Sequence, residues 1–118
     1  VFHRIIPNFM VQGGGFTTDY RQKPTRAPIA IESNNGLKNN RGTIAMARYD
    51  EGNPQKSSSP TEFFIVTNTE QATRFYKQYV VFGKITKGMA VIDSMQKQRS
   101  FDEKPVIPVK FKLSLLKD

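Results

Sequence analysis

The chain has 118 residues, a formal net charge of +8 and no cysteine. This length allows one domain, residues 1–118, and argues against two. A chain without cysteine has no disulfide framework, no cysteine-bound metal and no thiol nucleophile. No apolar run approaches the ~20 residues that a membrane-spanning helix needs, so we expect no membrane partner.

Short apolar runs alternate with turn residues along the chain, which is typical of a mainly β protein. The continuous run at residues 63–66 predicts a buried strand. Residues 109–115 alternate apolar and polar side chains, which predicts a strand with one buried and one solvated face. We expect strands at residues 2–6, 9–12, 43–47, 63–66, 80–85 and 109–115.

The remaining segments predict one helix and several loops. Apolar residues recur at three- and four-residue spacing over residues 87–97, which predicts an amphipathic helix with Thr86 as its N-cap. Gly36 can adopt a positive φ in a turn. We expect loops at residues 17–28 and 50–60, a turn at residues 33–36, and an irregular segment or helical turn at residues 67–78. Many short strands with one helix indicate a β-barrel or sandwich with a helical cover.

Most patterns of metal, nucleophile or phosphate chemistry are weak in this chain. His3 is the only histidine, so we interpret it as a hydrogen-bonded strand residue and not as a metal ligand. The glycines at residues 13–15 lack the following Lys-Ser/Thr of a phosphate loop and predict a bulge or tight turn. No serine lies in a nucleophile motif. We therefore expect neither a metal nor a cofactor.

One apolar segment carries residues that suit a binding pocket. Arg4 lies in an apolar run and is followed closely by Phe9, Met10 and Gln12. Long charged side chains are rarely buried without a partner. If these residues lie on two adjacent strands, the arginine can donate hydrogen bonds beside an aromatic floor that binds an apolar ring. The alternative is that the Arg4 stem covers apolar surface while its charge stays in water.

These residues belong to a longer motif. Residues 2–14, Phe-His-Arg-Ile-Ile-Pro-Asn-Phe-Met-Val-Gln-Gly-Gly, closely resemble the core motif of the cyclophilins, the cyclosporin-type peptidyl-prolyl isomerases. Further agreement covers essentially the whole chain, and the glycines at residues 13–15 resemble the bacterial branch. The agreeing segments are residues 41–47, residues 63–65, residues 81–84 and residues 88–89.

The resemblance implies an eight-stranded antiparallel barrel capped by helices, and catalysis of cis/trans isomerisation at X–Pro bonds. It implies that Arg4 donates to the prolyl nitrogen, that Gln12 orients the peptide, and that Ala47 leaves space and a backbone group for the residue before proline. The apolar pocket for the proline ring would be formed by Phe9, Met10 and Phe64.

Several positions depart from the common family pattern. Glu62 stands where members commonly have Gln, so we expect its carboxylate near Arg4. Such a pair would hold the carboxyl pKa low, and if it competes with the substrate, Glu62→Gln would raise catalytic efficiency. The alternatives are that Glu62 orients Arg4, or that it points away and only solvates the rim. Arg48 and Tyr79 replace a common Asn and a common His. The rim lacks tryptophan, so Phe75 is our candidate for the neighbouring wall, and we expect only weak binding of cyclosporin-like ligands.

The family also places two strands and a helix before the motif that begins at Phe2, so we expect a longer protein in which these elements complete the barrel. The implied partners are proline-containing peptides and unfolded proteins. Two alternatives are a catalytically weak module that binds proline-containing segments, and salt-sensitive nucleic-acid binding through the diffuse +8 charge, which we favour least. Basic charge without cysteine favours a bacterial periplasm, with the cytoplasm as the alternative.

Overall fold

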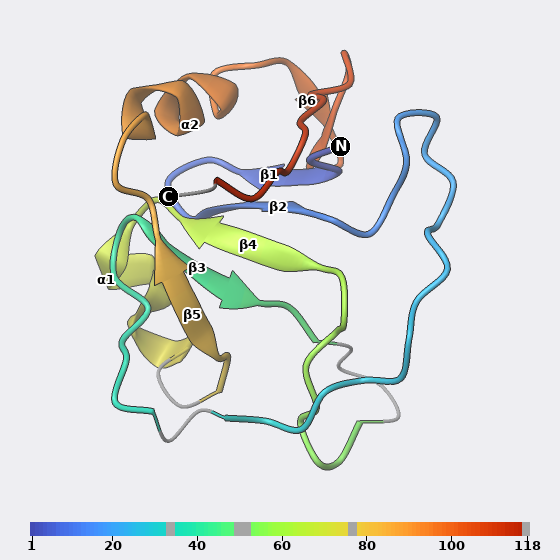
Figure 1. Cartoon of the computed structure of the whole chain (residues 1–118). Coiled ribbons are helices and arrows are strands. Elements are labelled where there is room, and N and C mark those ends of the chain that lie inside the picture. The colour runs from blue at the N-terminus through green and yellow to red at the C-terminus, as the bar shows by residue number, and fades with distance from the viewer. Residues whose placement is uncertain (33–34, 49–52, 76–77, 117–118) are drawn as a thin grey trace.

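A computed structural model describes residues 1–32, 35–48, 53–75 and 78–116. Its centre is a five-stranded antiparallel sheet in the order β1-β2-β4-β3-β5 (Figure 1). The strands are β1 (Arg4–Ile6), β2 (Met10–Gly13), β3 (Thr43–Met46), β4 (Phe63–Val66) and β5 (Val81–Lys84). A hairpin of β6 (Ser100–Phe101) and β7 (Lys104–Pro105) forms a second, two-stranded sheet. The expected mainly β architecture is confirmed, although the described strands form an open sheet and no closed barrel of eight strands.

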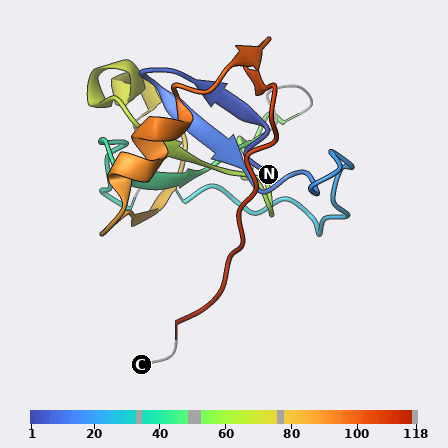
Figure 2. The same ribbon diagram turned by 90° about the horizontal axis from the view of Figure 1, so that it is seen from above.

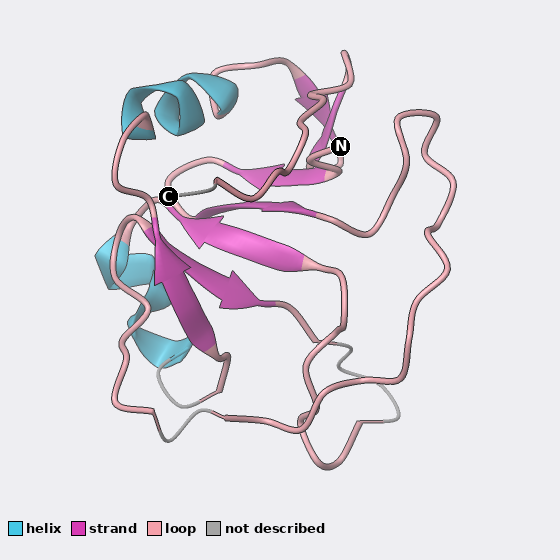
Figure 3. Cartoon of the chain, viewed as in Figure 1, coloured by secondary structure: helices cyan, strands magenta, loops and turns pink. Residues whose placement is uncertain are grey.

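The alternation of side chains along the strands gives the central sheet two apolar faces. The helix α1 (Thr69–Ala72) and the 3-10 helix η1 (Thr73–Phe75) cover one face (Figure 3). The helix α2 (Met89–Met95) covers the other face. The buried residues of the first face are Met10, Ala45, Ala47, Phe64, Val66, Ala72 and Val81. Those of the second face are Phe2, Ile5, Val11, Ile65 and Ile92.

The helices begin at different kinds of cap. Asn68 lies in an extended conformation and its side chain accepts a hydrogen bond from the backbone N–H of Gln71, which caps α1. The predicted helix at residues 87–97 is present as the shorter α2, but the expected Thr86 N-cap is wrong. Gly88 occupies the cap position with φ of 89° and no side-chain hydrogen bond, so the chain turns through this glycine before the helix starts.

The expected strand at residues 109–115 is wrong. The backbone N–H of Phe2 donates to the Val109 carbonyl at 2.9 Å, and the Phe111 ring lies 4.3 Å from that of Phe2. Among the described residues, no backbone hydrogen bond is formed beyond Val109, and Leu115 is 97% exposed. Figure 2 shows this segment extending away from the sheet. Alternation decides which side chains share a face, but a strand also needs a neighbouring backbone with which to bond.

Three other expected segments lie partly outside the described ranges: residues 33–34 of the turn, residues 50–52 of the loop, and residues 76–77 of the irregular segment. Gly36 has φ of 79°, as predicted for its turn. Within the part of the chain that the structure describes, no helix is long and apolar enough to cross a membrane.

Candidate functional site

Strand register brings Arg4, Gln12 and Phe64 into one row across the sheet. Arg4 lies opposite Gln12 on β1 and β2, and Gln12 lies opposite Phe64 on β2 and β4. Directly opposed residues present their side chains on the same face, so these three share one surface. Met10 lies two residues before Gln12 and therefore faces the same way. The local sequence thus places a cation, an amide and apolar groups side by side.

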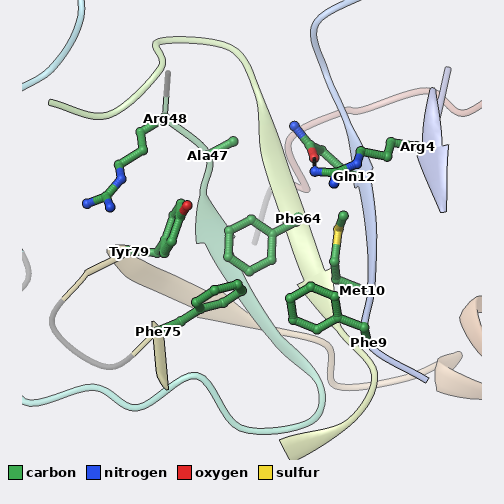
Figure 4. Close-up of a pocket in the computed structure, with 9 residues that line it drawn as sticks. All are labelled: Arg4, Phe9, Met10, Gln12, Ala47, Arg48, Phe64, Phe75 and Tyr79. Carbon is green, nitrogen blue, oxygen red and sulfur yellow. Dashed lines mark hydrogen bonds between the residues drawn. The ribbon is translucent and has the colours of Figure 1, made fainter. Parts of the chain in front are cut away.

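This row forms one side of a pocket (Figure 4). The other side comes from the chain after β3, from η1 and from the segment before β5. The structure brings nine of the ten expected site residues together, and Glu62 lies outside the group. The lining residues are Arg4, Phe9, Met10, Gln12, Ala47, Arg48, Phe64, Phe75 and Tyr79.

Aromatic rings form the apolar part of this pocket. The Phe64 ring lies 5.5 Å from that of Tyr79 and 5.9 Å from that of Phe75, both edge to face. Phe75 also contacts Phe9, with 5.2 Å between centroids. Each such pair is worth about 0.5–1.5 kcal/mol beyond the burial of its area. The rings therefore hold one another in place, and the apolar surface exists before any ligand binds.

Two arginines stack on this aromatic group. The Arg48 guanidinium lies 4.5 Å from the centroid of the Tyr79 ring and donates to the Gln78 carbonyl at 2.7 Å. Arg74, which the sequence reasoning did not single out, lies 5.4 Å from the centroid of the Phe75 ring. Guanidinium groups are attracted to the faces of aromatic rings, so the apolar pocket has a basic rim.

The polar end of the pocket is built around Arg4. Its Nε donates to Oε1 of Glu103 at 2.9 Å, and its Nη1 donates to Oε1 of Gln12 at 3.5 Å. The side chains of Arg4 and Glu103 are 47% and 44% exposed. The sequence reasoning missed Glu103, because nothing in the local pattern links residues that are 99 positions apart.

The expected pairing of Glu62 with Arg4 is wrong. Oε1 of Glu62 lies 3.3 Å from Nε2 of His3, while Arg4 binds Glu103. Neighbouring residues of an extended chain point to opposite sides, so His3 and Arg4 face different surroundings. Burial raises the pKa of the Glu62 carboxyl, contrary to the expected lowering. The expected gain from Glu62→Gln therefore loses its basis.

His3 is also not the fully hydrogen-bonded residue that the sequence suggested. Its Nδ1 atom is buried and has no hydrogen-bond partner among the described residues. Burial, with the N-terminal amino group and Arg4 as further causes, lowers the pKa of His3 to about 4. The imidazole is therefore neutral near pH 7, and its contact with Glu62 is not an ion pair at that pH.

The neutral, buried His3 predicts a loss of stability in acid. The unfolded chain binds a proton at His3 near pH 6.5, whereas the folded chain does so only near pH 4. Between these values the unfolded state binds more protons, so the free energy of unfolding should fall by about 1–3 kcal/mol as the pH drops from 7 to 4. Urea unfolding of the wild type and of His3→Gln at each pH measures this contribution.

His3→Gln should lack this part of the decrease, because glutamine does not titrate. The raised pKa of Glu62 acts in the opposite direction just above its reference pKa of 4.5, since there the folded state holds the extra proton. An equal change in unfolding free energy for the two proteins between pH 7 and pH 4 would contradict the assignment to His3.

Ala47 provides room but its backbone groups are already engaged. Its N–H donates to the Glu62 carbonyl at 3.0 Å, and its carbonyl accepts from the N–H of Ser59 at 2.7 Å. The backbone group that the family resemblance implies for the residue before proline is therefore already hydrogen-bonded within the chain. The small side chain still leaves the pocket open above β3. Among the described residues, no group of three or more metal-ligating side chains gathers here or elsewhere.

Known proteins resemble this chain over most of its length. The sequence pattern of the family described as cyclophilin type peptidyl-prolyl cis-trans isomerase/CLD matches residues 1–113. A peptidyl-prolyl cis-trans isomerase of Acinetobacter baylyi is 51% identical over 98 residues, which are 80% of this chain and 50% of the relative. Isomerase A of Dickeya dadantii is 48% identical over 99 residues, again 80% of this chain and 50% of the relative.

A peptidyl-prolyl cis-trans isomerase B of Escherichia coli is 41% identical over 102 residues, which are 81% of this chain and 60% of that protein. The chain thus spans about half the length of the first two relatives and somewhat more of the third. All three relatives carry the same activity in their names.

Proposed function

The chain belongs to the cyclophilin-type peptidyl-prolyl cis-trans isomerase family, and on this premise we propose that its pocket accelerates rotation about X–Pro bonds. The observation that carries the proposal is the position of Arg4 and Gln12 at one end of a preformed aromatic pocket. A proline-containing substrate needs an apolar pocket beside hydrogen-bonding groups, because the proline ring is apolar while the bond that rotates is an amide. The substrates are then proline-containing peptides.

The chemistry needs neither a nucleophile nor a metal. Amide resonance sets a rotation barrier of ~18–20 kcal/mol, and no covalent bond breaks. As resonance is lost, the prolyl nitrogen regains its lone pair and accepts a hydrogen bond from the Arg4 guanidinium. This bond is stronger in the transition state than in the ground state, so it lowers the barrier and does not merely bind the substrate.

The other lining residues hold the substrate in this proposal. Phe9, Met10 and Phe64 surround the proline ring, and Phe75 and Tyr79 extend the apolar wall. Gln12 orients the peptide from beside Arg4, to which its side chain is already hydrogen-bonded. Ala47 admits the residue before proline, and Arg48 borders that side of the pocket.

The proposal predicts that the chain accelerates cis-to-trans isomerisation of a short peptide containing an Ala-Pro bond. The uncatalysed step takes tens of seconds or longer near 25 °C, which makes the acceleration easy to record. A second proline-containing peptide should slow the reaction by competition. Competition without acceleration would instead support the alternative of a module that binds proline-containing segments.

We also propose that the five-stranded sheet is part of the eight-stranded barrel that the family resemblance implies. The antiparallel pairing of the five strands and the family match over residues 1–113 support this. We further propose that the cellular substrates are unfolded proteins. Cyclosporin-like molecules would bind this pocket weakly. The proposed compartment is a bacterial periplasm.

A further inference from the structure

The hairpin beside β1 has an unfavourable turn. β6 and β7 are joined by Asp102 and Glu103, whose φ angles are 51° and 68°. Two-residue hairpin turns with positive φ at both positions favour sequences such as Asn-Gly, because a side chain at the second position is strained. A residue held in this region costs on the order of 1 kcal/mol, so other contacts must hold Glu103 there.

Within the part of the chain that the structure describes, the hydrogen bonds of Glu103 join it to β1. Its backbone carbonyl accepts from the N–H of Ile5 at 2.7 Å, and its carboxylate accepts from Nε of Arg4 at 2.9 Å. The adjacent Lys104 is directed elsewhere, with its Nζ 3.8 Å from the centroid of the Tyr20 ring. The strained turn therefore places one carboxylate against one edge of the Arg4 guanidinium.

We propose that Glu103 is a positioning residue for Arg4, an inference that rests on the proposed isomerase function. A guanidinium offers five N–H donors in a planar fork. When Nε is bound by Glu103, the Nη groups at the other edge are left for Gln12 and for the substrate. The carboxylate thus selects the orientation in which Arg4 donates into the pocket.

This orientation matters because the Arg4 side chain is 47% exposed. Without Glu103, the guanidinium would sample several rotamers in water. The conformational entropy lost on ordering it would then oppose each turnover. A half-exposed ion pair contributes little to global stability. The effect of Glu103 should therefore appear in the rate of the chemical step and only weakly in the unfolding free energy.

The test compares Glu103→Ala and Glu103→Gln with the matched control Asp102→Asn. The control removes one negative charge from the same turn, and asparagine tolerates a positive φ. With an Ala-Pro peptide we expect Glu103→Ala to lower kcat about 10-fold with little change in KM, since misplaced catalytic groups mainly affect the transition state. Glu103→Gln should lose less, because its amide oxygen still accepts from Nε, and Asp102→Asn should remain within about twofold of the wild type.

An unchanged or higher kcat in Glu103→Ala would overturn the inference, because the carboxylate would then be idle or would compete with the substrate. An equal loss in Asp102→Asn would also overturn it, since the effect would then come from net charge or from the hairpin itself.

A second measurement does not depend on activity. NMR of the Arg4 Nε–H group should show slow exchange with water and restricted motion in the wild type and in Asp102→Asn, and fast exchange in Glu103→Ala. Arg4 signals that are the same in all three proteins would overturn the positioning role. A wild-type chain without isomerase activity would reject the proposed function, and the NMR comparison would then decide by itself whether Glu103 holds Arg4.

Discussion

Arg4→Ala is expected to lower kcat/KM for X–Pro isomerisation by about 100- to 1,000-fold. Loss of one donor that stabilises developing charge costs about 2.7–4 kcal/mol in comparable enzymes, which corresponds to this range. Arg4 is hydrogen-bonded both to Gln12 in the pocket and to Glu103 outside it. We therefore expect no other lining residue to donate to the substrate in place of Arg4. The measurement is the isomerisation rate of an Ala-Pro peptide over a range of enzyme concentrations.

Two comparisons separate this role from a general effect of charge. Arg99→Ala removes an exposed arginine outside the pocket lining and should leave the rate unchanged. Arg4→Lys keeps the charge but loses the planar fork, so it should recover only part of the activity. The unfolding free energy of Arg4→Ala should change by about 1 kcal/mol or less, because the Arg4–Glu103 pair is half exposed. Full turnover by Arg4→Ala would reject the mechanism.

Gly14→Ala is expected to destabilise the fold by about 3 kcal/mol or more. Gly14 follows β2, is buried, and has φ of 94°, which L side chains rarely adopt. An added Cβ would lie 2.1 Å from the Thr61 carbonyl oxygen, and this neighbour is backbone that cannot rotate away. Urea unfolding should show a lower midpoint, or a chain without a cooperative transition.

Gly42→Ala is the matched control for this prediction. Gly42 has φ of 89°, but nothing among the described residues lies within 4 Å of the position that its Cβ would occupy. It therefore carries the conformational strain without the overlap, and we expect a loss of only about 1–2 kcal/mol. Equal losses in the two variants would show that backbone strain alone accounts for Gly14, and the contact with Thr61 would then be irrelevant.

Much of the pocket could be predicted from the sequence because it is encoded by neighbours along the chain. The segment of residues 2–14 contains β1 and β2, and their pairing places Arg4 and Gln12 opposite one another. Alternation within each strand then assigns Met10 to the same face. The family resemblance added Phe64, Phe75 and the other lining residues at positions that the structure also brings to the pocket.

Only the tertiary structure decided which charged groups meet. Glu62 and Glu103 are both acids near the pocket, yet Glu62 lies against His3 and Glu103 against Arg4. The second contact depends on the strained turn at residues 102–103 and on a backbone hydrogen bond to Ile5, neither of which leaves a signal in local composition. The strand expected at residues 109–115 is not formed, for a related reason. Alternation, turn residues and motifs are properties of short segments, whereas hydrogen bonding and ion pairing depend on which distant segment lies alongside.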